Sequence, residues 1–145
     1  MTDALTADTG RAAHALRLGL GFIWIYEGLV PKILLPLTDL ELEVVAASGL
    51  IPNGFEPSLL HGLGVLEIAL GLLIVWGILL RPLCVIQAAV VGLFTVLIPL
   101  THPAVLAHPF GLLSKNIPIL GAIVALWFVT AARTPQADAV RNNAT

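Results

Sequence analysis

Four ionisable side chains interrupt the apolar stretches of this sequence: Glu27, Lys32, Glu67 and Lys115. A charged group at the centre of a membrane helix costs about 2.5–3.5 kcal/mol on insertion scales, so such residues persist where they face a bundle interior and find partners. A buried carboxylate with a tuned pKa can also exchange protons with a bound substrate. We therefore interpret Glu27, Glu67 and Lys115 as candidate catalytic residues.

Other polar residues near these positions are candidates for binding a ligand: Lys32, His61, His108 and Asn116. Imidazole together with carboxylate suits zinc, iron or copper. The histidines show no HxxxH or ExxH spacing, so we assign no metal and expect them to form hydrogen bonds at the membrane surface. The single cysteine, Cys84, excludes a Cys-X-X-Cys redox motif. No GxGxxG or P-loop motif indicates a soluble cofactor.

The composition identifies the class of protein that must position these residues. Hydrophobic residues make up 58% of the 145-residue chain and charged residues 11%, with a mean hydropathy of +0.98. A soluble domain carries about 25% charged residues, so a soluble enzyme and a disordered chain are both excluded. The net charge of −2, without a basic run, argues against a nucleic-acid binder. We predict one all-α domain, an integral membrane four-helix bundle.

Four segments are long and apolar enough to cross a hydrocarbon core of about 30 Å. They comprise residues 16–37, 59–80, 83–100 and 110–132. Between the first two, the sequence LELEVVAASGLI is typical either of a short amphipathic helix at the membrane surface or of an ordered loop. We predict mobile polar tails at residues 1–12 and 135–145, which leaves residues 13–134 as the membrane domain.

The arginines predict the orientation of the bundle. With four crossings, all of them fall on one side of the membrane: Arg11, Arg17, Arg81, Arg133 and Arg141. Basic residues mark the cytoplasmic side, so we expect both termini in the cytoplasm. The pair Arg81-Pro82 leaves almost no loop between the second and third spans, which predicts an antiparallel hairpin.

The charged residues are predicted to lie at similar depth. At about 1.5 Å per residue, Glu67 lies roughly 12 Å and Glu27 roughly 13–15 Å below the outer ends of their spans. Lys115 and Asn116 lie roughly 8–9 Å down the fourth span from the same side. We therefore predict one polar pocket in the outer half of the bundle, open to the outside and closed below.

Two structural alternatives stay open for these charges. Lys32 follows Glu27 by five residues, about 140° around an ideal helix. It either extends to the lipid head groups or is redirected towards Glu27 by a kink at Pro31, a residue that also frees the Glu27 carbonyl. Glu67 and Lys115 either form an interhelical salt bridge that only fixes packing or belong to a functional site.

Three short motifs resemble those of the DoxX-like family of small four-helix bacterial membrane proteins. They are EGLVPK at residues 27–32, GVLE at residues 64–67, and HPFG at residues 108–111 leading to Asn116. The resemblance covers nearly all of residues 14–132. It implies a four-span bundle in the bacterial cytoplasmic membrane, and it carries over Glu27, Pro31, Lys32, Glu67 and Asn116 without a catalytic role. Relatives are linked to membrane redox chemistry, including a quinone-reducing thiosulfate oxidoreductase subunit and an oxidative-stress complex.

Three functions are consistent with these residues. The first is a redox-linked membrane subunit of an oxidoreductase, in which a quinone meets Lys115, Asn116 or His61 and exchanges protons with Glu27 or Glu67. The second is a structural or assembly accessory subunit whose charges only fix helix packing. The third is a small-solute transporter, which would need a homo-oligomer because four spans are few. Quinone is the one cofactor that we consider, and the expected partners are the lipid bilayer, a redox protein and a second copy of the chain.

Overall fold

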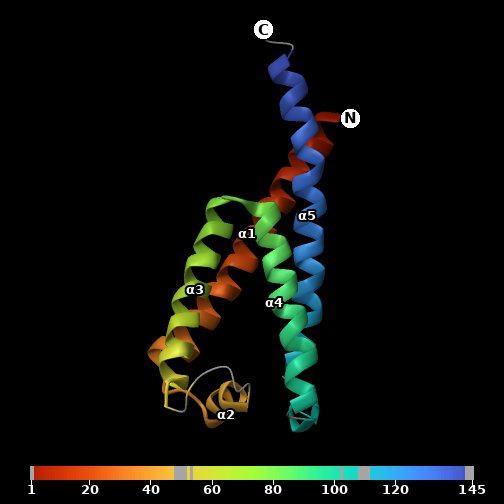
Figure 1. Ribbon diagram of the computed structural model, residues 1–145. Helices are drawn as coiled ribbons and strands as arrows, with labels where there is room; N and C mark the ends of the chain where they lie inside the picture. The colour runs from red at the N-terminus through yellow and green to blue at the C-terminus, as the bar shows by residue number, and fades with distance from the viewer. Residues whose placement is uncertain (1, 48–51, 53, 102, 108–111, 143–145) are drawn as a thin grey trace.

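The computed structural model describes residues 2–47, 52, 54–101, 103–107 and 112–142 (Figure 1). This part of the chain is all-α and contains no strand, as the sequence predicted. Its α-helices are α1 (Thr2–Leu29), α2 (Asp39–Ala47), α3 (Glu56–Trp76), α4 (Leu80–Thr101) and α5 (Leu112–Asn142). Two short segments complete it, the π-helix η1 (Val30–Leu34) and the 3₁₀ helix η2 (Pro103–Ala107).

Three helices of the described chain are long and apolar enough to cross a membrane. They cover Glu56–Trp76, Leu80–Leu100 and Ser114–Ala131. The predicted first span falls on α1 and η1, but α1 carries His14, Arg17 and Glu27 among its apolar residues and does not meet the same criterion. The prediction of a membrane protein is confirmed, and the number of four crossings stays a prediction.

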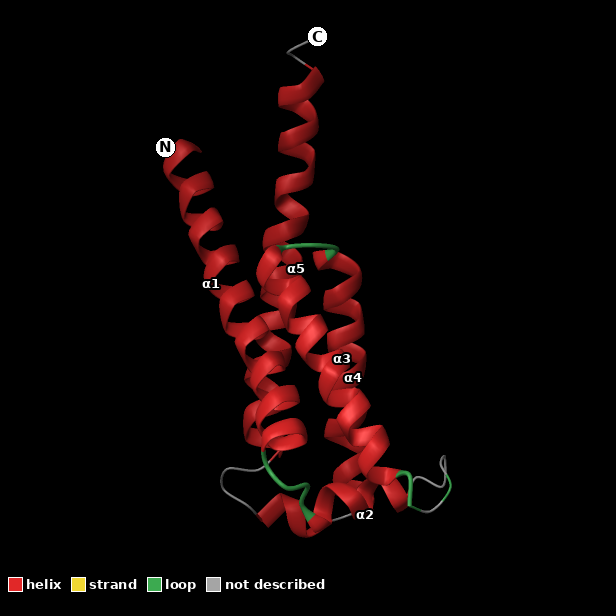
Figure 2. Cartoon of the chain, turned by 90° about the vertical axis from the view of Figure 1, so that its left-hand side faces the viewer, coloured by secondary structure: helices red, strands yellow, loops and turns green. Residues whose placement is uncertain are grey.

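The four long helices form two pairs, α1 with α3 and α4 with α5, and α1 also contacts α5 (Figures 1 and 2). The turn at residues 77–79 joins α3 to α4, and the two helices then diverge (Figure 1). The predicted hairpin is therefore antiparallel but is not packed along its length. Because α4 begins at Leu80, Arg81 and Pro82 lie in its first turn. Backbone N–H groups in the first turn have no acceptor within the helix, so the missing N–H of a proline costs no helical hydrogen bond there.

Both termini lie at the same end of the bundle, and α2 lies at the opposite end (Figure 1). α1 begins at Thr2 and α5 continues to Asn142, so the segments predicted as polar tails are helical where they are described. The two helices diverge towards their ends at this side of the molecule (Figure 2). The mobility of residues 1–12 and 135–145 stays a prediction.

Four glycines allow α1 and α3 to touch backbone to backbone. A Cβ atom built on Gly28 would lie 2.4 Å from the Gly64 carbonyl oxygen, and one on Gly64 would lie 2.8 Å from the Gly28 oxygen. Gly21 and Gly71 are related in the same way, at 2.9 and 2.7 Å. Small residues permit close approach of helices in lipid, where van der Waals packing drives association. Seven-residue spacing on both helices makes the two contacts repeat along one seam.

The core of the bundle lies between α1, α4, α5 and the last turn of α3, on the side of the termini. Leu20, Ile74, Ile123 and Leu126 are its most deeply buried apolar residues. Gln87 of α4 is fully buried among them, at 0% exposure, and its Oε1 accepts a hydrogen bond of 2.9 Å from the Trp24 indole. This bond fixes α1 against α4 inside the apolar core.

Arg17 secures the end of α3 against α1. Its guanidinium donates to the carbonyl oxygens of Ile74, at 3.0 Å, and Val75. These carbonyls belong to the last turn of α3, where the regular helical donors four residues on are missing, and the Ile74 carbonyl also accepts from the Gly77 N–H. Gly77 ends the helix in the left-handed conformation, with φ of +81°, and its N–H returns to Leu73 and Ile74.

The segment between the first and second long helices forms the short helix α2. Its N-cap is a capping box: the Thr38 hydroxyl accepts from the Glu41 N–H at 3.3 Å, and the Glu41 carboxylate accepts from the Thr38 N–H at 3.0 Å. The helical alternative is thus confirmed for residues 40–47, where the loop alternative is wrong, and residues 48–51 of the predicted segment lie outside the described residues. The location of α2 at the membrane surface stays a prediction.

Candidate functional site

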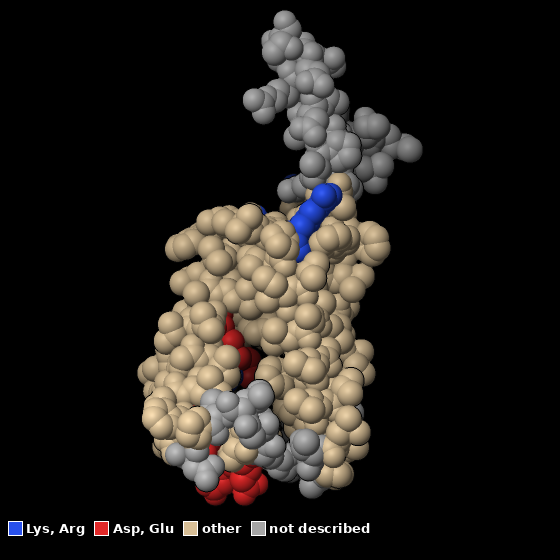
Figure 3. Space-filling model, viewed as in Figure 1, with Lys and Arg blue, Asp and Glu red and all other residues tan. Residues whose placement is uncertain are grey.

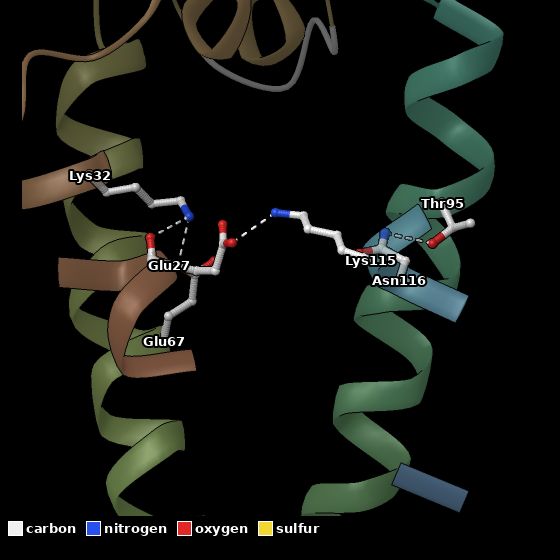
Figure 4. A network of polar contacts seen from close by, with 6 residues as sticks. All are labelled: Glu27, Lys32, Glu67, Thr95, Lys115 and Asn116. Carbon is white, nitrogen blue, oxygen red and sulfur yellow. Dashed lines mark hydrogen bonds and ion pairs between the residues drawn. The ribbon is translucent and has the colours of Figure 1, made fainter. Parts of the chain in front are cut away.

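The π-helix after Glu27 redirects Lys32 into the bundle. Pro31 has no N–H, so the Glu27 carbonyl loses its regular helical donor. The Lys32 ammonium replaces that donor at 3.0 Å and also binds the Glu67 carboxylate of α3 at 2.7 Å (Figure 4). The Lys32 and Glu67 side chains are 14% and 20% exposed. The alternative in which Lys32 extends to the lipid head groups is therefore wrong.

A second ion pair joins the two halves of the bundle. Lys115 reaches from α5 across the space between them, and its Nζ lies 2.7 Å from the Glu27 Oε1 (Figure 4). These two side chains are 45% and 34% exposed, so this pair is far more accessible than the first. The sequence left a pairing of Glu67 with Lys115 open. The structure instead pairs Lys115 with Glu27, and Lys32 with Glu67.

We call these four residues the charge network: Glu27, Lys32, Glu67 and Lys115. Its members come from α1, η1, α3 and α5, and the predicted meeting of the charged residues in one place is found in the structure. Equal numbers of carboxylates and ammonium groups make the network formally neutral, which lowers the cost of keeping it at membrane depth.

The structure places the predicted ligand-binding residues in different surroundings. Asn116 is 6% exposed and donates from Nδ2 to the Thr95 hydroxyl of α4 at 2.8 Å, beside the charge network but bonded away from it (Figure 4). His61 is exposed on α3, with Nδ1 2.6 Å from the Pro57 carbonyl oxygen, and takes no part in the network. His108 lies outside the described residues.

Sequence reasoning missed Thr95, the partner of Asn116. Its hydroxyl donates to the Val91 carbonyl one turn earlier, and this leaves its oxygen free to accept from Asn116. A hydroxyl within an otherwise apolar span was the available signal. Together the two residues hold α5 to α4 directly beside Lys115, so they position the lysine.

The charge network can be approached from two sides. A hollow lies between α3 and α4 in the space-filling view, with acidic atoms inside it (Figure 3). On another side a groove of about 750 Å³ follows α1 and α5, and its lining includes Glu27 and Lys115. The remaining lining residues are apolar. Within the part of the chain that the structure describes, no three His, Cys, Asp or Glu side chains could hold a metal ion.

Comparison with known protein families matches residues 21–124 to the DoxX-like family. The matched range includes all four members of the charge network and covers well over half of the chain. Comparison with curated proteins and with solved structures gives no match. The family match agrees with the apolar helices and with the motifs around Glu27 and Glu67. The chain therefore belongs to the DoxX-like family.

Proposed function

We propose that this membrane protein is a redox-linked subunit that binds a quinone head group at the Glu27–Lys115 ion pair. One observation carries the proposal. The pair is about 40% exposed, within an apolar groove, while the Lys32–Glu67 pair is largely buried. An apolar site with a few placed polar groups is the usual form of a small-molecule site.

The chemistry of the pair fits a quinone. The Lys115 ammonium can donate a hydrogen bond to a quinone carbonyl oxygen, and Glu27 lies 2.7 Å from the same nitrogen, within reach to exchange a proton. Conversion of a quinone to a quinol takes up two electrons and two protons. In this proposal the residues of the network handle protons, and a partner redox protein supplies the electrons.

The buried pair has a different task in this proposal. Lys32 binds both the Glu67 carboxylate and the Glu27 carbonyl, so it fixes the backbone from which the Glu27 side chain projects. We assign Lys32 and Glu67 as positioning residues and Glu27 and Lys115 as the ligand-binding residues. A purely structural accessory subunit is the second candidate function, and the complete pairing of all four charges favours it.

The proposed location is the bacterial cytoplasmic membrane with both termini in the cytoplasm. Arg17 and Arg81 lie at the end of the bundle that holds the termini, and α2 with Asp39, Glu41 and Glu43 lies at the other end (Figure 1). Basic residues favour the cytoplasmic side. A reporter that is active only in the cytoplasm should be active when fused after residue 145. A reporter that is active only in the periplasm should be active when inserted at Gly54. The opposite pattern would contradict this orientation.

Quinone binding separates the two candidate functions. We expect Glu27→Gln and Lys115→Met each to weaken quinone binding about 10- to 100-fold, since a hydrogen bond to a charged group contributes about 1.5–3 kcal/mol. The measurement is quinone titration of the protein in lipid nanodiscs. Glu43→Gln makes the same chemical change on the exposed face of α2 and should bind as the wild type does.

The structural alternative makes a different prediction for the same titration. It requires that the wild type bind no quinone, or that Glu27→Gln and Lys115→Met bind it unchanged while remaining folded. Either result would refute the proposed redox role. Helical content and size-exclusion behaviour of each variant should be recorded beside the titration, so that loss of binding is attributed to folded protein.

A further inference from the structure

The groove along α1 and α5 suggests what kind of quinone the site takes. We infer that it holds the hydrocarbon tail of the ligand, so that the ligand is a long-chain prenyl quinone whose head reaches the Glu27–Lys115 pair. This inference rests on the proposed function and deepens it. The residues that line the groove on α1 run from Ala12 to Glu27, and the part within the predicted first span, from Leu16 to Glu27, is about 16 Å long at 1.5 Å per residue.

Small residues make the groove hollow. Its lining includes Ala12, Ala15 and Gly19 on α1 and Pro118 and Ala122 on α5, and the larger apolar lining residues are Leu16, Leu20, Ile23 and Ile119. A Cβ atom added to Gly19 would meet nothing within 4 Å, whereas one added to Gly21 would collide with α3. Gly21 thus lies on the face of α1 that packs against α3, and Gly19 lies on the open face that lines the groove.

The chemistry of the groove suits a hydrocarbon chain. Apart from Glu27 and Lys115, the residues that line it are apolar. A cross-linking experiment distinguishes a quinone tail in this groove from a second copy of the chain.

The polar end of the groove indicates a head group rather than a plain lipid tail. Glu27 and Lys115 lie among the lining residues at the far end from Ala12, and both keep part of their surface exposed. A tail lying along the groove would bring its head to these two side chains. Two carbonyl oxygens on a prenylated ring match the ammonium donor, which has hydrogen bonds to give beyond its contact with Glu27.

Filling the groove tests this inference. We expect Gly19→Phe to block the tail, since Gly19 lines the groove and a Cβ atom there meets nothing within 4 Å. Gly62→Phe is the matched control, because a Cβ there also meets nothing within 4 Å. Each variant is titrated in nanodiscs with a tailless benzoquinone and with a quinone that has a long prenyl tail. Wild type and variant share the same membrane, so partitioning of the quinone into lipid cancels.

We expect the long tail to tighten binding about tenfold in the wild type and in Gly62→Phe. Gly19→Phe should lose this gain and keep its affinity for the tailless quinone. If Gly19→Phe keeps the gain, the groove is not the tail site, and the proposed quinone site itself stands. If the wild type binds neither quinone, the proposed function fails and the inference fails with it.

A second copy of the chain is the competing occupant of the groove. Ala15→Cys lies on the groove lining and would form a disulfide between two copies under mild oxidation if their α1 helices met there. We expect no cross-linked dimer from this variant at low protein-to-lipid ratio. An efficient dimer would overturn the assignment of the groove to a quinone tail.

Discussion

Gly28→Ala should lower the free energy of unfolding by about 3 kcal/mol, the upper part of the range for overpacked positions. The added Cβ would lie 2.4 Å from the Gly64 carbonyl oxygen and 3.0 Å from the Glu67 Cβ. The first of these atoms belongs to the backbone of α3 and cannot move aside as a flexible side chain would. The helices must separate, and the Lys32–Glu67 contact lengthens with them. Titration with sodium dodecyl sulfate in mixed micelles measures the change.

Gly62→Ala is the matched control for this prediction. It makes the same change on α3, two residues from Gly64, where a Cβ meets nothing within 4 Å. We expect it to be neutral or slightly stabilising, because alanine favours the helix over glycine by up to about 1 kcal/mol. Equal effects of Gly28→Ala and Gly62→Ala would mean that α1 and α3 are not in backbone contact.

Lys32→Met should be the second strongly destabilising substitution, at about 3 kcal/mol. Removal of one partner leaves Glu67 as a buried charge without compensation, which costs about 3–5 kcal/mol in protein interiors. Lys115→Met should cost less, about 1 kcal/mol, since its pair with Glu27 is about 40% exposed. The double variant Lys32→Met, Glu67→Gln should recover much of the loss, because an uncharged pair of similar size replaces the ion pair.

A double-mutant cycle evaluates this pairing directly. We expect a coupling free energy above about 1 kcal/mol between Lys32 and Glu67, and a value near zero between Lys115 and Glu67, which share no contact in the network. Strong coupling of Lys115 to Glu67 would mean that these two residues form an ion pair, the alternative that the sequence left open. Failure of the double variant to recover stability would show that Lys32 acts through something other than Glu67.

Much of the fold follows from residue types alone. Long apolar segments can satisfy their backbone groups in lipid only as helices, so the all-α class and the approximate spans were predictable. The capping box at Thr38 and Glu41 was present in the sequence, and its residues mark the start of α2. The packing of α3 was not predictable from connectivity. Its glycines face α1, and this contact outweighs adjacency in the chain to α4.

The sequence predicted that the charged residues lie together but not how they pair, and it grouped with them His61, which lies apart on α3. Depth counted in residues brought Glu27, Glu67 and Lys115 to one level because rise per residue is nearly constant. The direction of Lys32 could not be counted in the same way. A π-helix changes the angle per residue, and the ideal angle of about 140° no longer applies after Pro31. The groove depends on the divergence of α1 from α5, which no local pattern encodes.

The central claim is that both lysines of the chain bind glutamates of one intramembrane network, Lys32 with Glu67 and Lys115 with Glu27. Because Lys32 and Lys115 are the only lysines, ¹⁵N-lysine labelling gives two Nζ signals. Solid-state NMR in lipid bilayers, with glutamate ¹³Cδ labelling, should show a strong dipolar coupling for each, as N–O contacts of 2.7 Å require. Glu27→Gln should abolish the coupling of the Lys115 signal, and Glu67→Gln should abolish that of the Lys32 signal. Two lysine signals without carboxylate coupling would contradict the account.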